Sequence, residues 1–252
     1  MVGPGLIGTS VILAAQRAWP QVDVRVADRG DALEPLASAD VVVVSTPVEA
    51  IEGILALLAP LAGPRTLVLD TGSTKRGVMA AARAAGLPRF VGGHPMAGGT
   101  AGAEGADAGL FDGRPWFLMG GSADAAAEAR AFVTALGARP IAIDDQGERH
   151  DRVMAAVSHL PQVTSSALMV VAERAVSADE LAWAGAGLRD TTRLASSRAE
   201  VWQGILATNT DLVAPLLKQL AADLAALADS LDDPAAVGEL FDAAVRAKAS
   251  CL

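Results

Sequence analysis

Glycines near the start of the chain have the spacing of a phosphate-binding turn. Gly3, Gly5 and Gly8 form the pattern G-x-G-x-x-G, and Leu6 and Ile7 lead directly into a helix-compatible stretch. In such a turn the first glycine permits a tight bend, the second lets the backbone approach a pyrophosphate, and the third allows close helix packing. The N–H groups of the helix start would add a partial positive charge. The pattern predicts a dinucleotide site only if a strand and an acidic residue follow, because other glycine-rich turns share it.

An acidic residue lies at the distance that such a site requires. Asp28 ends an apolar run twenty residues after the last glycine of the pattern. Its carboxylate would accept hydrogen bonds from the adenosine ribose and repel a 2′-phosphate, which favours NAD. Arg29 weakens that preference, so NADP stays an alternative, and an ordinary turn aspartate is the other interpretation of Asp28. Three further candidate cofactor contacts follow the next apolar run: Ser45, Thr46 and Pro47.

Two later turns carry side chains suited to acid–base chemistry. Ser73 follows the run that ends at Leu69, and His94 lies in the segment G-G-H-P-M-A-G after the next run. Both would sit at the carboxyl ends of parallel strands, where open α/β sheets bind ligands. Pro95 favours an extended loop geometry at His94. We expect His94 to be catalytic, while Ser73 or Thr74 could instead cap a helix.

The second half of the chain offers polar residues in apolar surroundings. The segments S-H-L-P-Q, with His159 and Gln162, and G-L-R-D-T-T-R, with Arg189 and Arg193, stand out. A guanidinium group binds a carboxylate in a bidentate fashion, so the two arginines suggest an anionic ligand. Asp190 between them could simply cap a helix.

The elements that must position these residues fall into two groups. Up to Asp144–Gly147, short Val/Leu/Ile runs alternate with helical stretches, which indicates βαβ units and a parallel sheet buried on both faces. The expected strands are Val22–Ala27, Val41–Ser45, Thr66–Leu69, Arg89–Val91, Trp116–Met119 and Pro140–Ile143. The expected helices between them are Leu6–Ala18, Val48–Leu58, Thr74–Ala85 and Ala123–Leu136.

Beyond that point the pattern predicts helices alone. We expect Arg149–Ala175, Ala199–Leu231 and Pro234–Ala249 to be helical, with a break at Ala184–Gly187 and a kink at Pro161. The fold class is thus an α/β, Rossmann-type, doubly wound parallel sheet (residues 1–146) plus an all-α domain (residues 147–252). A leucine-rich stripe in the helical domain could form a core or a homodimer interface; its members are Leu206, Leu212, Val213, Leu216, Leu217, Leu220 and Leu224.

The composition excludes several other kinds of chemistry. The 252 residues carry a net charge of −9 without a Lys/Arg cluster, so no nucleic-acid partner is expected. Three histidines and a single cysteine, Cys251, lead us to expect neither a metal nor a disulfide framework. With 52% hydrophobic and 19% charged residues, the chain should fold into a globular protein. We find no apolar run of about eighteen residues and no secretory leader, and therefore expect a cytoplasmic protein without a membrane partner.

Taken in order, these segments resemble the prephenate/arogenate dehydrogenase family of tyrosine biosynthesis. The resemblance rests on the glycine turn, Gly72–Lys75, Gly92–Gly98, Ser158–Pro161, Arg189–Arg193 and Trp202, and runs from Gly3 to about Leu217. The His-Pro-Met-Ala-Gly and Arg-Asp-Thr-Thr-Arg segments are more specific to this family than the glycine pattern. The family combines a Rossmann domain with a helical dimerisation domain.

The resemblance implies an activity and a role for each candidate residue. It implies NAD-dependent oxidative decarboxylation of a small molecule, prephenate to 4-hydroxyphenylpyruvate, with arogenate as the alternative substrate. His94 would accept the substrate's hydroxyl proton, Ser73 would orient the hydroxyl or the ring, and Arg193 would hold a carboxylate. Three other residues would contribute to substrate binding: Gln162, Trp202 and His159.

The chain departs from the family pattern in several places. Only two residues precede the first glycine, so the first strand is short and we expect the natural chain to begin upstream. The stretch between Asp28 and Asp40 is short, Thr100 stands where a glutamate is common, and Gln162 replaces a second histidine found in some members. Two alternatives therefore stay open. One is another two-domain NAD(P) enzyme, such as a β-hydroxyacid dehydrogenase; the other is a catalytically silent dinucleotide-binding protein.

Overall fold

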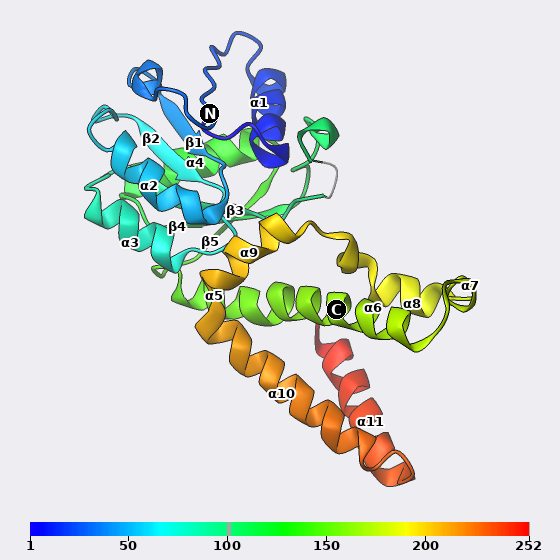
Figure 1. Ribbon diagram of the computed structural model, residues 1–252. Coiled ribbons are helices and arrows are strands. Elements are labelled where there is room, and N and C mark those ends of the chain that lie inside the picture. The colour runs from blue at the N-terminus through cyan, green and yellow to red at the C-terminus, as the bar shows by residue number, and fades with distance from the viewer. Residues whose placement is uncertain (100–101, 252) are drawn as a thin grey trace.

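The computed structural model describes residues 1–99 and 102–251, which form an α/β part followed by a helical part (Figure 1). The strands are β1 (Val41–Val44), β2 (Leu67–Asp70), β3 (Phe90–Pro95), β4 (Pro115–Met119) and β5 (Arg139–Ala142). The helices around them are α1 (Leu6–Ala18), α2 (Val48–Leu58), α3 (Arg76–Ala84) and α4 (Ala123–Ala135). The helical part contains α5 (Glu148–Met154), a π-helical turn (Ala155–His159), α6 (Leu160–Ala175), α7 (Ala178–Leu181), α8 (Ala186–Thr191), α9 (Ala199–Ala207), α10 (Thr210–Ala228) and α11 (Pro234–Cys251).

The sheet has the order β1-β2-β3-β4-β5, and the start of the chain continues it beyond β1. Val2 forms parallel bridges to Val44 on one side and to Ala27 on the other. The backbone N–H of Val2 donates to the carbonyl of Val43 (2.9 Å), and the N–H of Gly3 donates to the carbonyl of Ala27 (2.9 Å). The residues before the glycine turn therefore occupy an interior position of the sheet, as a dinucleotide-binding fold requires.

Helices cover both faces of the sheet, which confirms the expected doubly wound architecture. Alternate residues of each strand point to opposite faces, so that Val42 and Val44 join one core cluster and Val43 joins the other. Residues of α2 and α3 complete the first cluster, and residues of α1 and α4 complete the second. Both clusters consist of buried hydrophobic side chains.

Three features of the α/β part differ from the sequence-based expectations. The strand expected at Val22–Ala27 is wrong, because only Ala27 is paired and Val22 and Val26 are exposed. The sheet is not wholly parallel, since β4 runs antiparallel to β3, while β1–β2, β2–β3 and β4–β5 are parallel. β3 continues to Pro95, well past the strand end expected at Val91, because Gly92–Pro95 pair with β4.

In the helical part, α5, the π turn and α6 form one continuous helix (Figure 1). The helix continues through Pro161 without interruption. Its hydrogen bonding departs from the α-helical pattern in the π turn just before this proline. Residues Glu148–Ala175 are long and apolar enough to cross a membrane by length and composition alone, a criterion that core helices also meet. Buried Asp151 and His159 on this helix bind neighbouring segments, which indicates a core helix.

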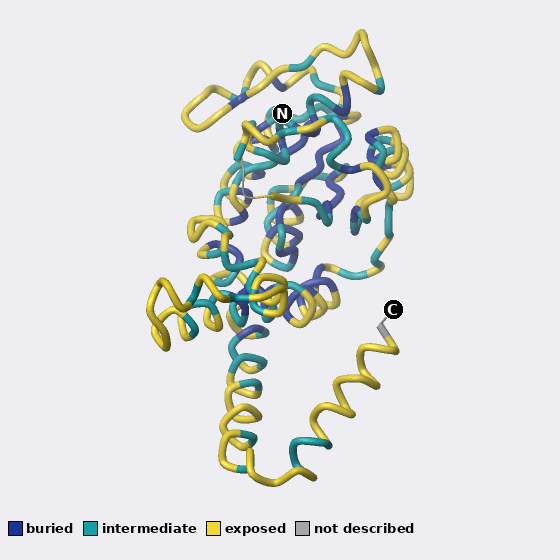
Figure 2. Tube along the Cα trace, turned by 90° about the vertical axis from the view of Figure 1, so that its right-hand side faces the viewer, coloured by how far each residue is buried: buried dark blue, intermediate teal, exposed yellow. Residues whose placement is uncertain are grey.

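The single helix expected at Ala199–Leu231 is wrong, because the chain turns at Thr208–Asn209 between α9 and α10. The buried side-chain amide of Asn209 binds groups on the long helix, which fixes that turn. Beyond it, α10 and α11 project from the body as an arm whose surface is largely exposed (Figure 2). The leucine-rich stripe is accordingly covered only in part within one chain, and Leu224 is 54% exposed.

Candidate active site

The glycine turn has the backbone geometry that the sequence pattern predicts. Gly3 has φ of +83°, a conformation that favours glycine, and a Cβ there would lie 2.9 Å from the Ser45 carbonyl carbon. A Cβ at Gly8 would lie 2.2 Å from the Gly3 carbonyl oxygen, so α1 packs directly on the turn. A Cβ at Gly5 would meet nothing within 4 Å, which leaves the face of the turn open.

These features fit the pyrophosphate of a dinucleotide. No side chain caps the start of α1 and its first turn has no acidic residue, so its N–H groups and positive dipole end are available to an anion. Beside the turn, the buried hydroxyl of Thr46 has no hydrogen-bond partner among the described atoms. Gly3, Gly5 and Gly8, with Leu6 and Ile7 on α1, are the residues that would hold the phosphates.

The other candidate cofactor contacts lie at the adjoining strand ends. Ser45 donates its backbone N–H to the Val2 carbonyl (2.7 Å), and its hydroxyl oxygen accepts a hydrogen bond from Thr71 (2.9 Å). Pro47 is the residue just before α2. Asp28 is exposed, and one carboxylate oxygen accepts the N–H of Arg29 (2.7 Å). Asp28 thus makes a turn contact of its own and keeps its second oxygen available for a ribose.

His94 lies inside β3, which corrects the expectation that it belongs to a loop. It is paired across the sheet with Phe117 and is buried. The two preceding residues are glycines because neighbouring atoms leave no room for a side chain. A Cβ at Gly93 would lie 2.3 Å from the Asp70 carbonyl oxygen, and a Cβ at Gly92 would lie 2.5 Å from the Met79 sulfur. The imidazole is therefore carried by a rigid strand.

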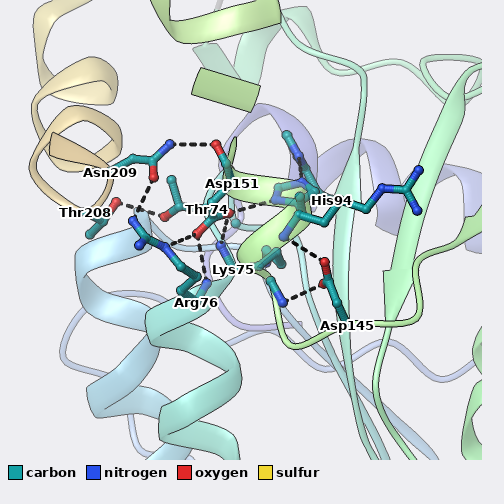
Figure 3. Close-up of polar contacts among 12 residues, drawn as sticks. Thr74, Lys75, Arg76, His94, Asp145, Asp151, Thr208 and Asn209 are labelled. Carbon is teal, nitrogen blue, oxygen red and sulfur yellow. Dashed lines mark hydrogen bonds and ion pairs between the residues drawn. The ribbon is translucent and has the colours of Figure 1, made fainter. Parts of the chain in front are cut away.

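A chain of hydrogen bonds extends from His94 into the helical part (Figure 3). His94 Nδ1 lies 2.9 Å from His150 Nε2, and the two rings meet edge to face at a centroid distance of 5.0 Å. His150 Nδ1 lies 2.8 Å from Asp151 Oδ1. Burial is the main cause that holds the pKa of His94 well below its usual value of 6.5, and any positive charge on His150, Lys75 or His159 lowers it further. His94 is therefore neutral at pH 7, as a proton acceptor must be.

The loop between β2 and α3 anchors Asp151 from the opposite side (Figure 3). The backbone N–H groups of Lys75 and Arg76 donate to its two carboxylate oxygens at 2.8 and 2.9 Å. Burial alone would raise the pKa of Asp151, but the hydrogen bonds from His150, Arg76 and Lys75 outweigh it and lower the pKa. Asp151 is therefore an ionised acceptor.

A fully buried ion pair supports the same loop. Lys75 pairs with Asp70 at the end of β2, and both side chains are 0% exposed. Asp70 also accepts the backbone N–H of Gly72 (2.8 Å) and that of Gly93 (3.0 Å), the residue before His94. Burial lowers the pKa of the Lys75 ammonium, and the charges of Asp70 and Asp151 oppose this shift. The pair thus fixes the loop to the strand that carries His94.

His159 and Trp202 meet on the helical side of this region. Their rings are 5.9 Å apart in an edge-to-face arrangement. His159 is buried, which lowers its pKa to about 4, and its Nδ1 lies 3.2 Å from the Asn209 side-chain nitrogen. Asn209 also donates to the Asp151 carbonyl (2.9 Å) and accepts from Arg76 (3.0 Å). His159 is therefore a neutral acceptor at pH 7.

The remaining candidates occupy separate places. Ser73 is half-buried in the β2–α3 loop, and Arg193 is exposed at the start of a 3₁₀ turn, Arg193–Ser196. Gln162 uses its amide to hold that turn, donating to the Leu194 carbonyl (2.8 Å) and accepting from Ser197 (3.2 Å). Thr100 lies outside the described residues.

Sequence reasoning missed His150, Asp151 and Asn209. His150 and Asp151 stand at the beginning of the long helix, 56 residues or more from His94, and no motif spacing links them to it. One signal was available: the chain has only three histidines, and all three are buried in this region. A charged or titratable residue is rarely buried without a partner, so three buried histidines point to one polar network.

Comparisons with known proteins agree with this geometry. Residues 10–142 match the family model described as prephenate dehydrogenase, nucleotide-binding domain, and residues 146–241 match prephenate dehydrogenase, dimerization domain. The fold is similar to a crystal structure of prephenate dehydrogenase from Aquifex aeolicus in complex with hydroxyphenyl propionate and NAD+. That likeness has a TM-score of 0.82 at 21% identity and covers 98% of this chain and 96% of that one.

Three curated relatives align with most of the chain. It is 28% identical to a prephenate dehydrogenase of Lactococcus lactis, with 84% of this chain and 65% of that protein covered. It is 34% identical to a probable prephenate dehydrogenase of Streptomyces niveus (92% and 68% covered) and 30% identical to a cyclohexadienyl dehydrogenase of Zymomonas mobilis (89% and 85% covered). The chain thus spans about two thirds of the length of the first two relatives. Because the two family models together cover most of the sequence, the chain belongs to the prephenate dehydrogenase family.

Proposed function

We propose that this protein oxidises prephenate with NAD and releases CO₂, giving 4-hydroxyphenylpyruvate and NADH. The observation that carries the proposal is the neutral, buried His94 near the carboxyl end of β3, at the same edge of the sheet as the open glycine turn. His94 Nδ1 is engaged by His150, which leaves Nε2 as the nitrogen for a substrate hydroxyl. Family membership and the name of the Lactococcus lactis relative support this reaction over that of a β-hydroxyacid dehydrogenase.

The role of His94 follows from the proton balance of the reaction. His94 Nε2 would accept the proton of the C4 hydroxyl as C4 loses its hydride and becomes a carbonyl. Loss of the ring carboxylate as CO₂ then pushes its electron pair into the ring and leaves a phenolate oxygen at C4. That oxygen takes the proton back from His94, so the imidazole stores one proton and no base in solution is required.

Other residues of the site would bind and orient the substrate. Arg193 offers a guanidinium group to a substrate carboxylate, and Gln162 secures the turn on which Arg193 sits. Ser73 would orient the hydroxyl or the ring from the β2–α3 loop. Trp202 and His159 would contact the substrate from the helical part. Their joint task is to align C4 with the nicotinamide.

NAD is the cofactor that the glycine turn and Asp28 support best. The free oxygen of Asp28 can accept a ribose hydroxyl and would repel a 2′-phosphate. The Aquifex aeolicus relative carries NAD+ in its crystal structure. When bound, the nicotinamide supplies the hydride acceptor, and the protein supplies position and the proton acceptor.

A homodimer formed through the helical part is the assembly we propose. The arm α10–α11 leaves apolar side chains such as Leu224, Phe241 and Val245 more than half exposed, and large apolar side chains exposed together mark an interaction site. The match of residues 146–241 to a dimerization domain supports dimerisation through this part of the chain. A second copy related by a two-fold axis would cover it.

The test is NADH absorbance at 340 nm with NAD and either prephenate or arogenate, together with CO₂ release. Prephenate turnover at a higher kcat/KM than arogenate turnover supports the proposal. The reverse preference makes the protein an arogenate dehydrogenase, a substrate class in keeping with its cyclohexadienyl dehydrogenase relative. Cofactor binding without turnover of either substrate would show a silent dinucleotide-binding protein and would refute the proposal.

A further inference from the structure

We propose that His150 and Asp151 are positioning residues that fix the tautomer of His94, so that its Nε2 always presents the lone pair. Only the use of that lone pair, acceptance of the proton of the substrate hydroxyl, rests on the proposed function. Its structural basis is the line of three side chains from Asp151 through His150 to His94, with separations of 2.8 and 2.9 Å.

Asp151 sets the direction of every hydrogen bond in that line. Its oxygens accept backbone N–H groups from Lys75 (2.8 Å) and Arg76 (2.9 Å), in addition to the contact with His150. An ionised carboxylate has only acceptor sites. The nitrogen that faces it, His150 Nδ1, must therefore carry a hydrogen.

The two imidazoles transmit this constraint. A neutral imidazole has one N–H and one lone pair, so His150 with its hydrogen on Nδ1 offers a lone pair at Nε2. His94 Nδ1 must then donate to it, and the lone pair of His94 falls on Nε2. A doubly protonated His150 would instead donate to His94 Nδ1 and leave the hydrogen of His94 on Nε2, which is the arrangement that the nitrogen NMR spectrum described below distinguishes from the proposed one.

The arrangement joins elements that lie far apart in the sequence. His94 is on β3, His150 and Asp151 are on α5 in the helical part, and the groups that anchor Asp151 belong to the β2–α3 loop. The proton acceptor is thus set correctly only when the two parts of the chain are docked. After His94 takes up a proton, its Nδ1–H still donates to His150, which stabilises the imidazolium in the way that a buried carboxylate stabilises the histidine of a serine protease triad.

Two substitutions at one position separate tautomer control from proton transfer. His150→Phe keeps a flat ring but removes the acceptor for His94. His150→Gln retains an amide oxygen able to accept from His94 Nδ1–H and an amide N–H₂ able to donate to Asp151, but it does not titrate. The proposal predicts that kcat falls by about 10²–10⁴ in His150→Phe, the range for general acid–base catalysis and for a wrong tautomer. In His150→Gln, kcat stays within about tenfold of the wild type.

The decisive readout is the nitrogen NMR spectrum of the protein labelled with ¹⁵N-histidine, recorded at about pH 8. With only three histidines, the signals can be assigned from His94→Asn and His150→Phe. The expected wild-type result is a protonated Nδ1 and a bare Nε2 at His94, kept in His150→Gln and replaced by a mixture of tautomers in His150→Phe.

Three results would overturn the proposal: a hydrogen on Nε2 of His94 in the wild type, an unchanged tautomer in His150→Phe, or a kcat in His150→Gln as low as in His150→Phe. The wild-type spectrum decides even if a variant fails to fold. It is also independent of turnover, so an inactive wild-type protein with the expected tautomer would refute the proposed function and leave this inference standing.

Discussion

The buried ion pair beneath the site makes a sharp prediction for stability. Lys75 and Asp70 are both 0% exposed, and the ammonium group has only carboxylates to compensate its burial. Lys75→Met keeps most of the side-chain volume and removes the charge. The carboxylate of Asp70 would then remain buried without its cation, which is the costly way to disrupt such a pair.

The magnitude can be worked from the contacts that Asp70 keeps. Removing one partner of a buried pair costs about 3–5 kcal/mol. Asp70 retains two backbone donors, Gly72 N at 2.8 Å and Gly93 N at 3.0 Å, which places the loss at the lower end of that range. A loss of about 3 kcal/mol corresponds to a Tm decrease of about 6–12 °C for a chain of this size.

The assay is thermal unfolding followed by circular dichroism, with Arg17→Met as the matched control. Arg17 pairs with Asp112 at 2.7 Å, but the two side chains are 43% and 55% exposed. Solvent screens an exposed pair, so the control should lose much less Tm than Lys75→Met. Equal Tm losses in the two variants, or an unchanged Tm in Lys75→Met, would refute the reasoning about the buried pair.

Four further outcomes follow from the same structure. Arg193→Gln should mainly raise the KM for the substrate, because a charge-assisted contact is lost from the ground state; a raised KM for NAD instead would assign Arg193 to the cofactor. Asp28 should make kcat/KM higher with NAD than with NADP, and the opposite preference would show that Arg29 dominates. Folding lowers the pKa of His94 and lowers that of His159 to about 4, so below about pH 6.5 the unfolded chain binds more protons than the folded one. Tm should therefore fall as the pH drops from about 6.5 towards 4. A flat profile would contradict the burial of these rings. Light scattering should give twice the 25.5 kDa of one chain, whereas 25.5 kDa at micromolar concentration would rule out the proposed dimer.

Local signals in the sequence were sufficient for the elements around the glycine turn. The expected bounds of α1 and α2 agree with the structure, because a glycine turn and a proline mark where each helix begins. The same logic failed at β3. Consecutive glycines are typical of a loop, but Gly92 and Gly93 lie in a strand. Glycine is needed there because Asp70 and Met79 approach the backbone too closely for a Cβ.

Contacts between distant segments account for most of what the sequence could not reveal. His94 was identified from its neighbours in the chain, whereas His150 matters through one contact across 56 residues. The turn at Asn209 was missed for the same reason, since the amide is fixed by Asp151 and His159 on another helix. Helical periodicity reports which face is apolar, and it carries no information on which polar side chain lies opposite.

We propose that His94 accepts the proton as hydride leaves the substrate for NAD. The most direct measurement is pre-steady-state NADH formation at 340 nm by His94→Asn, with NAD affinity measured on the same preparation. We expect a rate lower by about two orders of magnitude or more, the scale of general acid–base catalysis, with NAD affinity nearly unchanged. A rate equal to that of the wild type would contradict it.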